Sequence, residues 1–197
     1  DVSSVTNMFA MFSNNRVFNQ NIGSWDTSKV TSMAQMFWRG NKFNQDINSW
    51  NVSKVTSMAQ MFLDATEFNQ DIGSWDVSGG LSSAFARMFT GANDFNNGGS
   101  DSIKNWDVSG SSGSMDYMFL RTNMSHDLST WCVPNITTAT DFASLTPMAA
   151  NSSSTYPKFG TCPTTATLVL TSDDSDNIIS TGQVTLTATF SLSMSPT

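Results

Sequence analysis

Few side chains in this chain could carry out acid–base catalysis. His126 is the only histidine among the 197 residues, and Glu67 is the only glutamate. A histidine base needs a nucleophile beside it and a third group that orients its ring. His126 lies in MSHDLSTW, which aligns residue for residue with the earlier phrase FNQDIGSW, so it takes the position of Gln45 and Gln70. We therefore expect His126 in a surface turn and expect a protein without catalytic residues.

Metal binding has one candidate segment. In DDSDN, the carboxylates of Asp173, Asp174 and Asp176 lie close together in the sequence. Ca²⁺ takes about six to eight oxygen ligands, and this segment lacks the glycine and the terminal glutamate of an EF-hand loop. A solvated turn is therefore the favoured interpretation. Calcium is the one candidate cofactor, and no other metal site is expected.

Both cysteines, Cys132 and Cys162, lie in one C-terminal segment. Two cysteines are too few for a closed zinc site, which needs four ligands. A disulfide between them is the expected alternative, and it would indicate an oxidising compartment.

A row of polar side chains follows four of the tryptophans and is the main binding candidate. Its members are Asp26, Asn51, Asp76 and Asp107. On an open strand face they would form a shallow strip that accepts hydrogen bonds from sugar hydroxyls or from a protein partner. Alternatively, they only keep the sheet soluble. Trp38 joins the candidates, because Leu63 and Thr90 replace it in equivalent units, which favours an exposed position in contact with a partner.

A repeat of about 25 residues would position these candidates. Trp25, Trp50 and Trp75 are 25 residues apart, and the dipeptide Met-Phe recurs at an equivalent position in five units, from Met11-Phe12 to Met118-Phe119. Four of these dipeptides are followed at a constant distance by Phe-Asn. Such self-similarity predicts a solenoid, in which each unit buries its apolar face against its neighbours.

Each unit is expected to contain a short helix and a short strand. In SKVTSMAQMF, residues 28–37, the apolar side chains fall at helical spacing, and Ser28 or Asp26 could cap the first turn. In IGSWDV, residues 72–77, the apolar spacing matches the strand of leucine-rich repeats. The tryptophan and phenylalanine rows are in phase with isoleucine and methionine and are expected in the core.

An asparagine row is expected to form an internal ladder. Its members are Asn19, Asn44, Asn69 and Asn96. A side-chain amide both donates and accepts hydrogen bonds, so it can satisfy the backbone groups that an irregular loop leaves open.

The predicted fold class is an α/β repeat solenoid over residues 1–163, leucine-rich-repeat-like, with a short parallel strand plus a short helix per coil. Residues 131–163 are expected to close it as a C-terminal cap stapled by Cys132 and Cys162, since an exposed final coil is an aggregation-prone edge. Residues 164–197 contain two alternating runs typical of β-strands and are expected to begin a sandwich domain. The chain starts within a repeat, so we expect a piece of a longer or processed protein.

The repeat phrases resemble those of a bacterial surface-protein family. M-x-x-M-F, F-N-Q-D-I and S-W-x-x-S-K-V-T-S-M are similar to the repeats called BspA-like, which are related to leucine-rich repeats. The resemblance covers residues 1 to about 163, including W-C-V-P-N-I and F-G-T-C-P. Residues 164–197 resemble about one third of a bacterial immunoglobulin-like module. This resemblance implies a cell-surface or secreted protein, with adhesion among the family's roles, and implies no reaction.

Composition restricts the partners. The net charge is −7 and the nine Lys and Arg residues form no basic stripe, so nucleic acid is not an expected partner. No apolar run approaches the roughly 18–20 residues of a membrane helix, so no membrane insertion is expected in this segment. The leading hypothesis is a non-enzymatic extracellular module, surface-bound or secreted, for adhesion or for recognition of a protein or glycan. The alternative is a structural subunit of an extracellular filament or virion fibre, assembling with copies of itself through its terminal strands.

Overall fold

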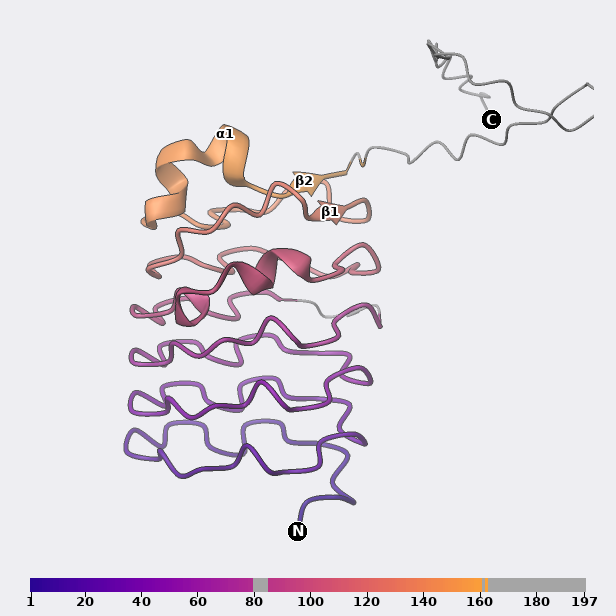
Figure 1. Ribbon diagram of the computed structural model, residues 1–197, viewed down its shortest axis with the longest axis vertical. Coiled ribbons are helices and arrows are strands. Elements are labelled where there is room, and N and C mark those ends of the chain that lie inside the picture. The colour runs from indigo at the N-terminus through magenta and orange to yellow at the C-terminus, as the bar shows by residue number, and fades with distance from the viewer. Residues whose placement is uncertain (80–84, 161, 163–197) are drawn as a thin grey trace, which may run out of the picture. The chain divides into compact units, whose positions relative to one another are not determined.

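The structure is a computed structural model that describes residues 1–79, 85–160 and 162, with only the backbone of residues 151–153 (Figure 1). The chain separates into two units, residues 1–163 and residues 164–197. The predicted strands of residues 164–197, with the candidate calcium loop of Asp173, Asp174 and Asp176, lie outside the described residues.

Regular secondary structure is sparse in the described residues. Their elements are η1 (Asn97–Gly99), η2 (Asp101–Asn105), β1 (Cys132–Val133), η3 (Pro147–Asn151), α1 (Ser152–Thr155) and β2 (Lys158–Phe159). The η elements are 3₁₀ helices, and β1 pairs with β2 in parallel. The prediction of an α/β, leucine-rich-repeat-like solenoid with a helix and a strand in each coil is therefore wrong. The four residues of α1 are the longest α-helix in the described part of the chain.

Turns replace the predicted helix. The N–H of Trp38 donates three residues back, to the carbonyl of Gln35 at 3.1 Å, whereas the N–H of Phe37 donates to the carbonyl of Met61 in the next repeat at 2.9 Å. Gln35 and Arg39 have φ angles of 59° and 56°. A left-handed residue cannot continue a right-handed helix. Because N–H groups alternate between a local turn and the neighbouring repeat, the helix-like apolar spacing arises here without a helix.

Successive repeats stack on one another, as the coils from indigo to magenta in Figure 1 show. Isolated parallel bridges join Asn7 to Ser32 and Ser32 to Ser57, each one repeat apart. The N–H of Thr31 donates to the carbonyl of Thr6 at 2.8 Å. One sequence repeat of about 25 residues thus forms one coil of the stack.

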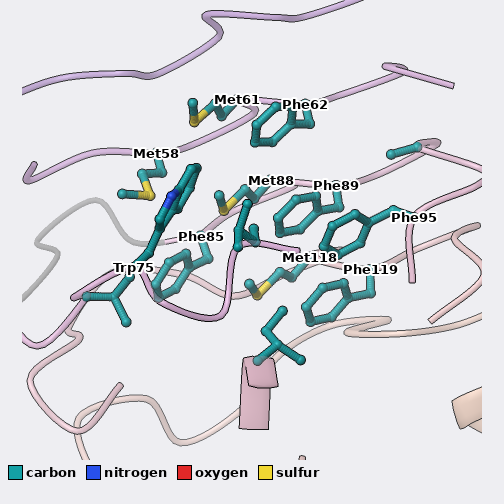
Figure 2. Close-up of a cluster of buried hydrophobic side chains, with 14 of the residues drawn as sticks. Met58, Met61, Phe62, Trp75, Phe85, Met88, Phe89, Phe95, Met118 and Phe119 are labelled. Atoms are coloured by element: carbon teal, nitrogen blue, oxygen red, sulfur yellow. The ribbon is translucent and has the colours of Figure 1, made fainter. Parts of the chain in front are cut away.

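Aromatic rows fill the interior of the stack (Figure 2). The ring of Phe62 lies 5.5 Å from that of Phe37 and 5.5 Å from that of Phe89, and 3.9 Å from Phe68 of the neighbouring row. All four side chains are fully buried. In the row that begins at Trp25, the tryptophans from Trp50 onward are buried too, and the indole N–H of Trp75 donates to a carbonyl of the preceding repeat at 3.0 Å. The prediction that these rows form the core is confirmed.

The predicted asparagine ladder is also confirmed, but its members are exposed or half-buried rather than internal. The Oδ1 atom of Asn19 accepts the N–H of Asn44 at 2.9 Å, and Asn44 accepts that of Asn69 at 2.9 Å. Asn69 continues the ladder to Asn96 at 2.8 Å, and Asn96 continues it to Ser125 at 2.9 Å. Each amide satisfies a backbone group of the next repeat.

A disulfide joins Cys132 to Cys162, as predicted, with their Cα atoms 5.5 Å apart. It lies beside the β1–β2 pair, in which Cys132 is opposite Lys158. Phe142 packs edge-on against Tyr156 and Phe159, at 5.5 and 5.6 Å. Edge-on packing differs from the parallel stacking of the earlier phenylalanines. The row of stacked phenylalanine rings therefore does not continue unchanged at the C-terminal end of the stack.

Candidate binding site

The predicted polar row is exposed, and each of its members closes a local turn. The N–H group two residues on donates to the side-chain oxygen at 3.0–3.1 Å in Asp26, Asn51, Asp76 and Asp107. In the last three of these turns the serine hydroxyl donates as well, at 2.6–2.7 Å. These are Asx turns, a usual role for aspartate and asparagine in loops. One oxygen of each side chain is therefore already hydrogen-bonded within its own turn, for any ligand that the row binds.

These turns lower the pKa of the three aspartates. Hydrogen bonds from the hydroxyl and then the N–H of the serine two residues on stabilise the carboxylate and lower the pKa of Asp26, Asp76 and Asp107. The row is therefore negatively charged at neutral pH.

Trp38 is half-buried. Its indole Nε1 is buried and has no hydrogen-bond partner within the described residues. The guanidinium carbon of Arg39 lies 5.0 Å from the ring centre, which is within cation–π range. The Trp38 ring thus contacts the Arg39 guanidinium through a cation–π interaction.

His126 is buried, so the prediction that it lies in a surface turn is wrong. Its side chain is 9% exposed. The ring nitrogen Nδ1 lies 2.6 Å from Oδ1 of Asp101, and Nε2 lies 3.0 Å from the carbonyl oxygen of Asn96. Asp101 belongs to η2, in the longer linker of the preceding repeat. The longer linker therefore contacts the His126 ring, whereas Gln45 and Gln70, at the same repeat position, are only half-buried.

The longer linker also contacts the repeat before it. Oδ1 of Asp71 accepts hydrogen bonds from the Ser102 hydroxyl at 2.6 Å, the Gly73 N–H at 2.8 Å and the Asn97 amide at 3.3 Å. Burial acts to raise the pKa of Asp71, but these hydrogen bonds outweigh it and lower the pKa. The linker is therefore an ordered part of the stack.

A polar pocket of about 340 Å³ opens elsewhere on the repeats. Its lining residues are Arg16, Arg39, Asn41, Asp64, Thr66, Gly91, Asn93 and Arg121. Asp64 lies between two of the arginines, with Oδ2 3.9 Å from Nε of Arg39 and Oδ1 3.5 Å from Nη2 of Arg121. The pocket therefore combines guanidinium groups with amide and hydroxyl side chains.

The lining comes from two positions of the repeat. The first is the left-handed residue two places after the Met-Phe dipeptide, and the second lies two places further on. Arg39, Asp64, Gly91 and Arg121 occupy the first position, with φ angles of 56–71°. Arg16, Asn41, Thr66 and Asn93 occupy the second position. We call these two positions the pocket rows.

Sequence reasoning missed the pocket. The arginines look scattered, because they lie in different repeats and the stack brings them together. A signal was present in the comparison of one repeat with the next. The phenylalanine and asparagine rows keep one residue type in most repeats, whereas the pocket rows change from arginine to aspartate, glycine, asparagine or threonine. Trp38 was the one predicted residue that reaches this region, through Arg39.

Comparison with known proteins identifies a family. A family model described as "Mycoplasma protein of unknown function, DUF285" matches residues 1–100 and 83–155. The chain belongs to this family. No curated protein matches it, and no solved structure matches it. The family's description assigns no function.

Two features are absent from the described residues. No helix among them combines the length and apolar character needed to cross a membrane. No group of three or more His, Cys, Asp or Glu side chains among them could hold a metal ion.

Proposed function

We propose that this chain is a non-enzymatic extracellular module, surface-bound or secreted, that recognises a protein or glycan and supports adhesion. The observation that carries the proposal is the pocket, which is open, polar and lined by residues that differ between repeats, on a stack whose interior rows stay the same. Binding sites are typically concave, and converging polar groups in them fix the orientation of the ligand. Variation at two surface positions changes ligand contacts without changing the core.

The extracellular location is supported by the disulfide between Cys132 and Cys162. Disulfides persist in oxidising compartments and are rare in the cytosol. The resemblance to BspA-like surface repeats agrees with that location.

Binding by the full chain tests the proposal. The chain would be immobilised and exposed to an array of extracellular glycans and matrix proteins, with bound ligand and any released product measured. We expect saturable binding without product release. Asn93→Trp should fill the pocket and weaken binding by about tenfold or more, whereas Asn123→Trp, at the same repeat position outside the pocket lining, should leave it unchanged. Turnover of a bound glycan that Asn93→Trp abolishes would overturn the proposal, as would the absence of any ligand.

A second candidate is a structural subunit that assembles end to end. Its support is the first repeat, where Phe9, Met11 and Val17 are 55%, 42% and 82% exposed. Apolar side chains gathered at one end of a stack favour association. Light scattering over a concentration series would distinguish the candidates: a mass that rises with concentration and falls for Val17→Ser favours a subunit, and a constant monomer mass opposes it.

A further inference from the structure

The arginines of this chain are concentrated at the pocket. The chain carries a net charge of −7 and has four arginines, of which Arg16, Arg39 and Arg121 line the pocket. Asp64 is the one carboxylate among the lining residues, so three arginines minus one aspartate leave an excess of two positive charges. A concave surface of one sign concentrates ligands of the opposite sign. The pocket therefore attracts an anion even though the chain as a whole is acidic.

Asp64 leaves most of the guanidinium donors available to a ligand. Its contacts with Arg39 and Arg121, at 3.9 and 3.5 Å, are longer than the roughly 2.7–3.2 Å of a good hydrogen bond. The two arginine side chains are 47% and 55% exposed. Arg16 is exposed and forms no ion pair with another side chain in the described part of the chain. A planar guanidinium fork with free donors matches the two oxygens of a carboxylate.

Gly91 keeps space open between the charged groups. A Cβ atom at this position would lie 2.4 Å from Oδ1 of Asp64 and 3.1 Å from Nη2 of Arg121. The remaining lining side chains include polar groups: the amide of Asn41 donates to the Thr66 hydroxyl at 3.3 Å, and Asn93 is exposed. Amides and hydroxyls both donate and accept hydrogen bonds, as sugar hydroxyls require.

We infer that this pocket binds the carboxylate of an acidic sugar within a glycan, with Arg16, Arg39 and Arg121 contacting the carboxylate and Asn41 and Asn93 contacting ring hydroxyls. The volume of about 340 Å³ lies at the lower end of the roughly 300–1,000 Å³ of small-molecule sites. An excess of only two positive charges on an acidic chain favours one isolated carboxylate over a densely sulfated or phosphorylated polymer. The inference rests on the proposed function and specifies its ligand.

Calorimetry on the full chain with matched trisaccharides tests the inference. The three probes end in glucuronic acid, in glucose, or in glucose 6-sulfate, so they differ only at carbon 6 of the terminal sugar. We expect the glucuronic acid probe to bind about tenfold or more tightly than either of the others, and to weaken as salt is added. Arg16→Gln and Arg121→Gln should each weaken that binding by about tenfold or more.

Arg87→Gln is the matched control, because Arg87 lies 4.8 Å from the ring centre of Tyr117 and does not line the pocket. It should change affinity less than twofold. Equal affinity for the glucose probe, preference for the sulfated probe, or unchanged binding by Arg16→Gln would each overturn the inference. Arg16 has no ion pair in the described residues, so that variant tests binding even if Arg121→Gln perturbs the fold. If calorimetry shows no preference for the glucuronic acid probe but the chain still binds ligands on the array, only the inferred ligand class is overturned. If the chain binds the carboxylate probe but shows no adhesion, the proposed function is overturned and the carboxylate site is retained.

Discussion

The interior rows and the pocket rows belong to the same repeat but follow different rules. Phe62 lies two residues before Asp64, yet the first is fully buried and the second is partly exposed. The Phe62 row keeps phenylalanine from the first repeat to the fifth, with neighbouring rings 5.4–5.6 Å apart. The Asp64 row changes residue at almost every repeat. The stack thus requires one residue type inside and accepts many at the pocket, which is where ligand contacts can differ.

Removing an interior ring should have the largest effect. Phe62→Ala deletes a buried side chain that stacks on Phe37, Phe68 and Phe89, and should lower the free energy of unfolding by about 3–5 kcal/mol. Thr66→Ala, in the pocket row of the same repeat, should cost less than about 1 kcal/mol. Urea unfolding followed by tryptophan fluorescence measures both. Equal losses would mean that the two sets of rows do not differ in their contribution to stability.

The asparagine ladder should show the next largest effect. Oδ1 of Asn69 accepts the N–H groups of Asn96 and Gly98, at 2.8 and 2.9 Å. Asn69→Ala leaves both donors without this partner and should cost about 1–3 kcal/mol. Asn69→Asp keeps an acceptor of the same shape and should cost less. If urea unfolding finds the two variants equally destabilised, the oxygen does not act as the acceptor that links the repeats.

Rows of identical residues were predictable from the sequence, and the local backbone was not. Periodicity alone placed Phe62 and Trp75 in internal rows and Asn69 in a ladder, because residues at equal spacing in a repeat meet the same neighbours. The helix prediction failed at Gln35, since apolar spacing of three to four residues fits both a helix and a series of turns. The φ angle of 59° at that residue excludes a helix, and glutamine carries no preference that would reveal it.

The buried His126 and the pocket were missed for a different reason. Both depend on which residues of separate repeats meet, and a single repeat does not contain that information. Asp101 reaches His126 from the longer linker of the preceding repeat, and Arg16 joins Arg121 only because several coils stack. Unequal residues at equal repeat positions were the available signal.

Asp71 should make stability depend on pH, with a smaller effect than the ladder. Its pKa is lowered in the folded chain, because hydrogen bonds from Ser102 and its neighbours outweigh burial. Its contribution is therefore present above the unfolded pKa of about 3.9 and is lost as the pH falls through the lower folded pKa. We expect Asp71→Asn to lower the free energy of unfolding by about 1 kcal/mol at pH 7 and to flatten its dependence on pH below about 4.

The matched control for this test is Asp46→Asn, one repeat earlier, where the carboxylate accepts the Asn48 N–H at 2.9 Å and has no linker beside it. Urea unfolding at several pH values measures both variants. An unchanged pH profile for Asp71→Asn would show that the linker does not depend on this carboxylate.

The arginines of the pocket should have the smallest effect on stability. The contacts of Arg39 and Arg121 with Asp64 are long and partly exposed, and exposed ion pairs contribute about 0–1 kcal/mol. Arg39→Gln and Arg121→Gln should therefore change the free energy of unfolding by less than about 0.5 kcal/mol each, with little dependence on salt. A loss as large as that of Asn69→Ala would mean that the charged cluster holds the repeats together, and its surplus of positive charge would then have a structural reason. A negligible loss would show that Arg39 and Arg121 have no role in folding, which is the pattern expected when arginines are kept for a ligand.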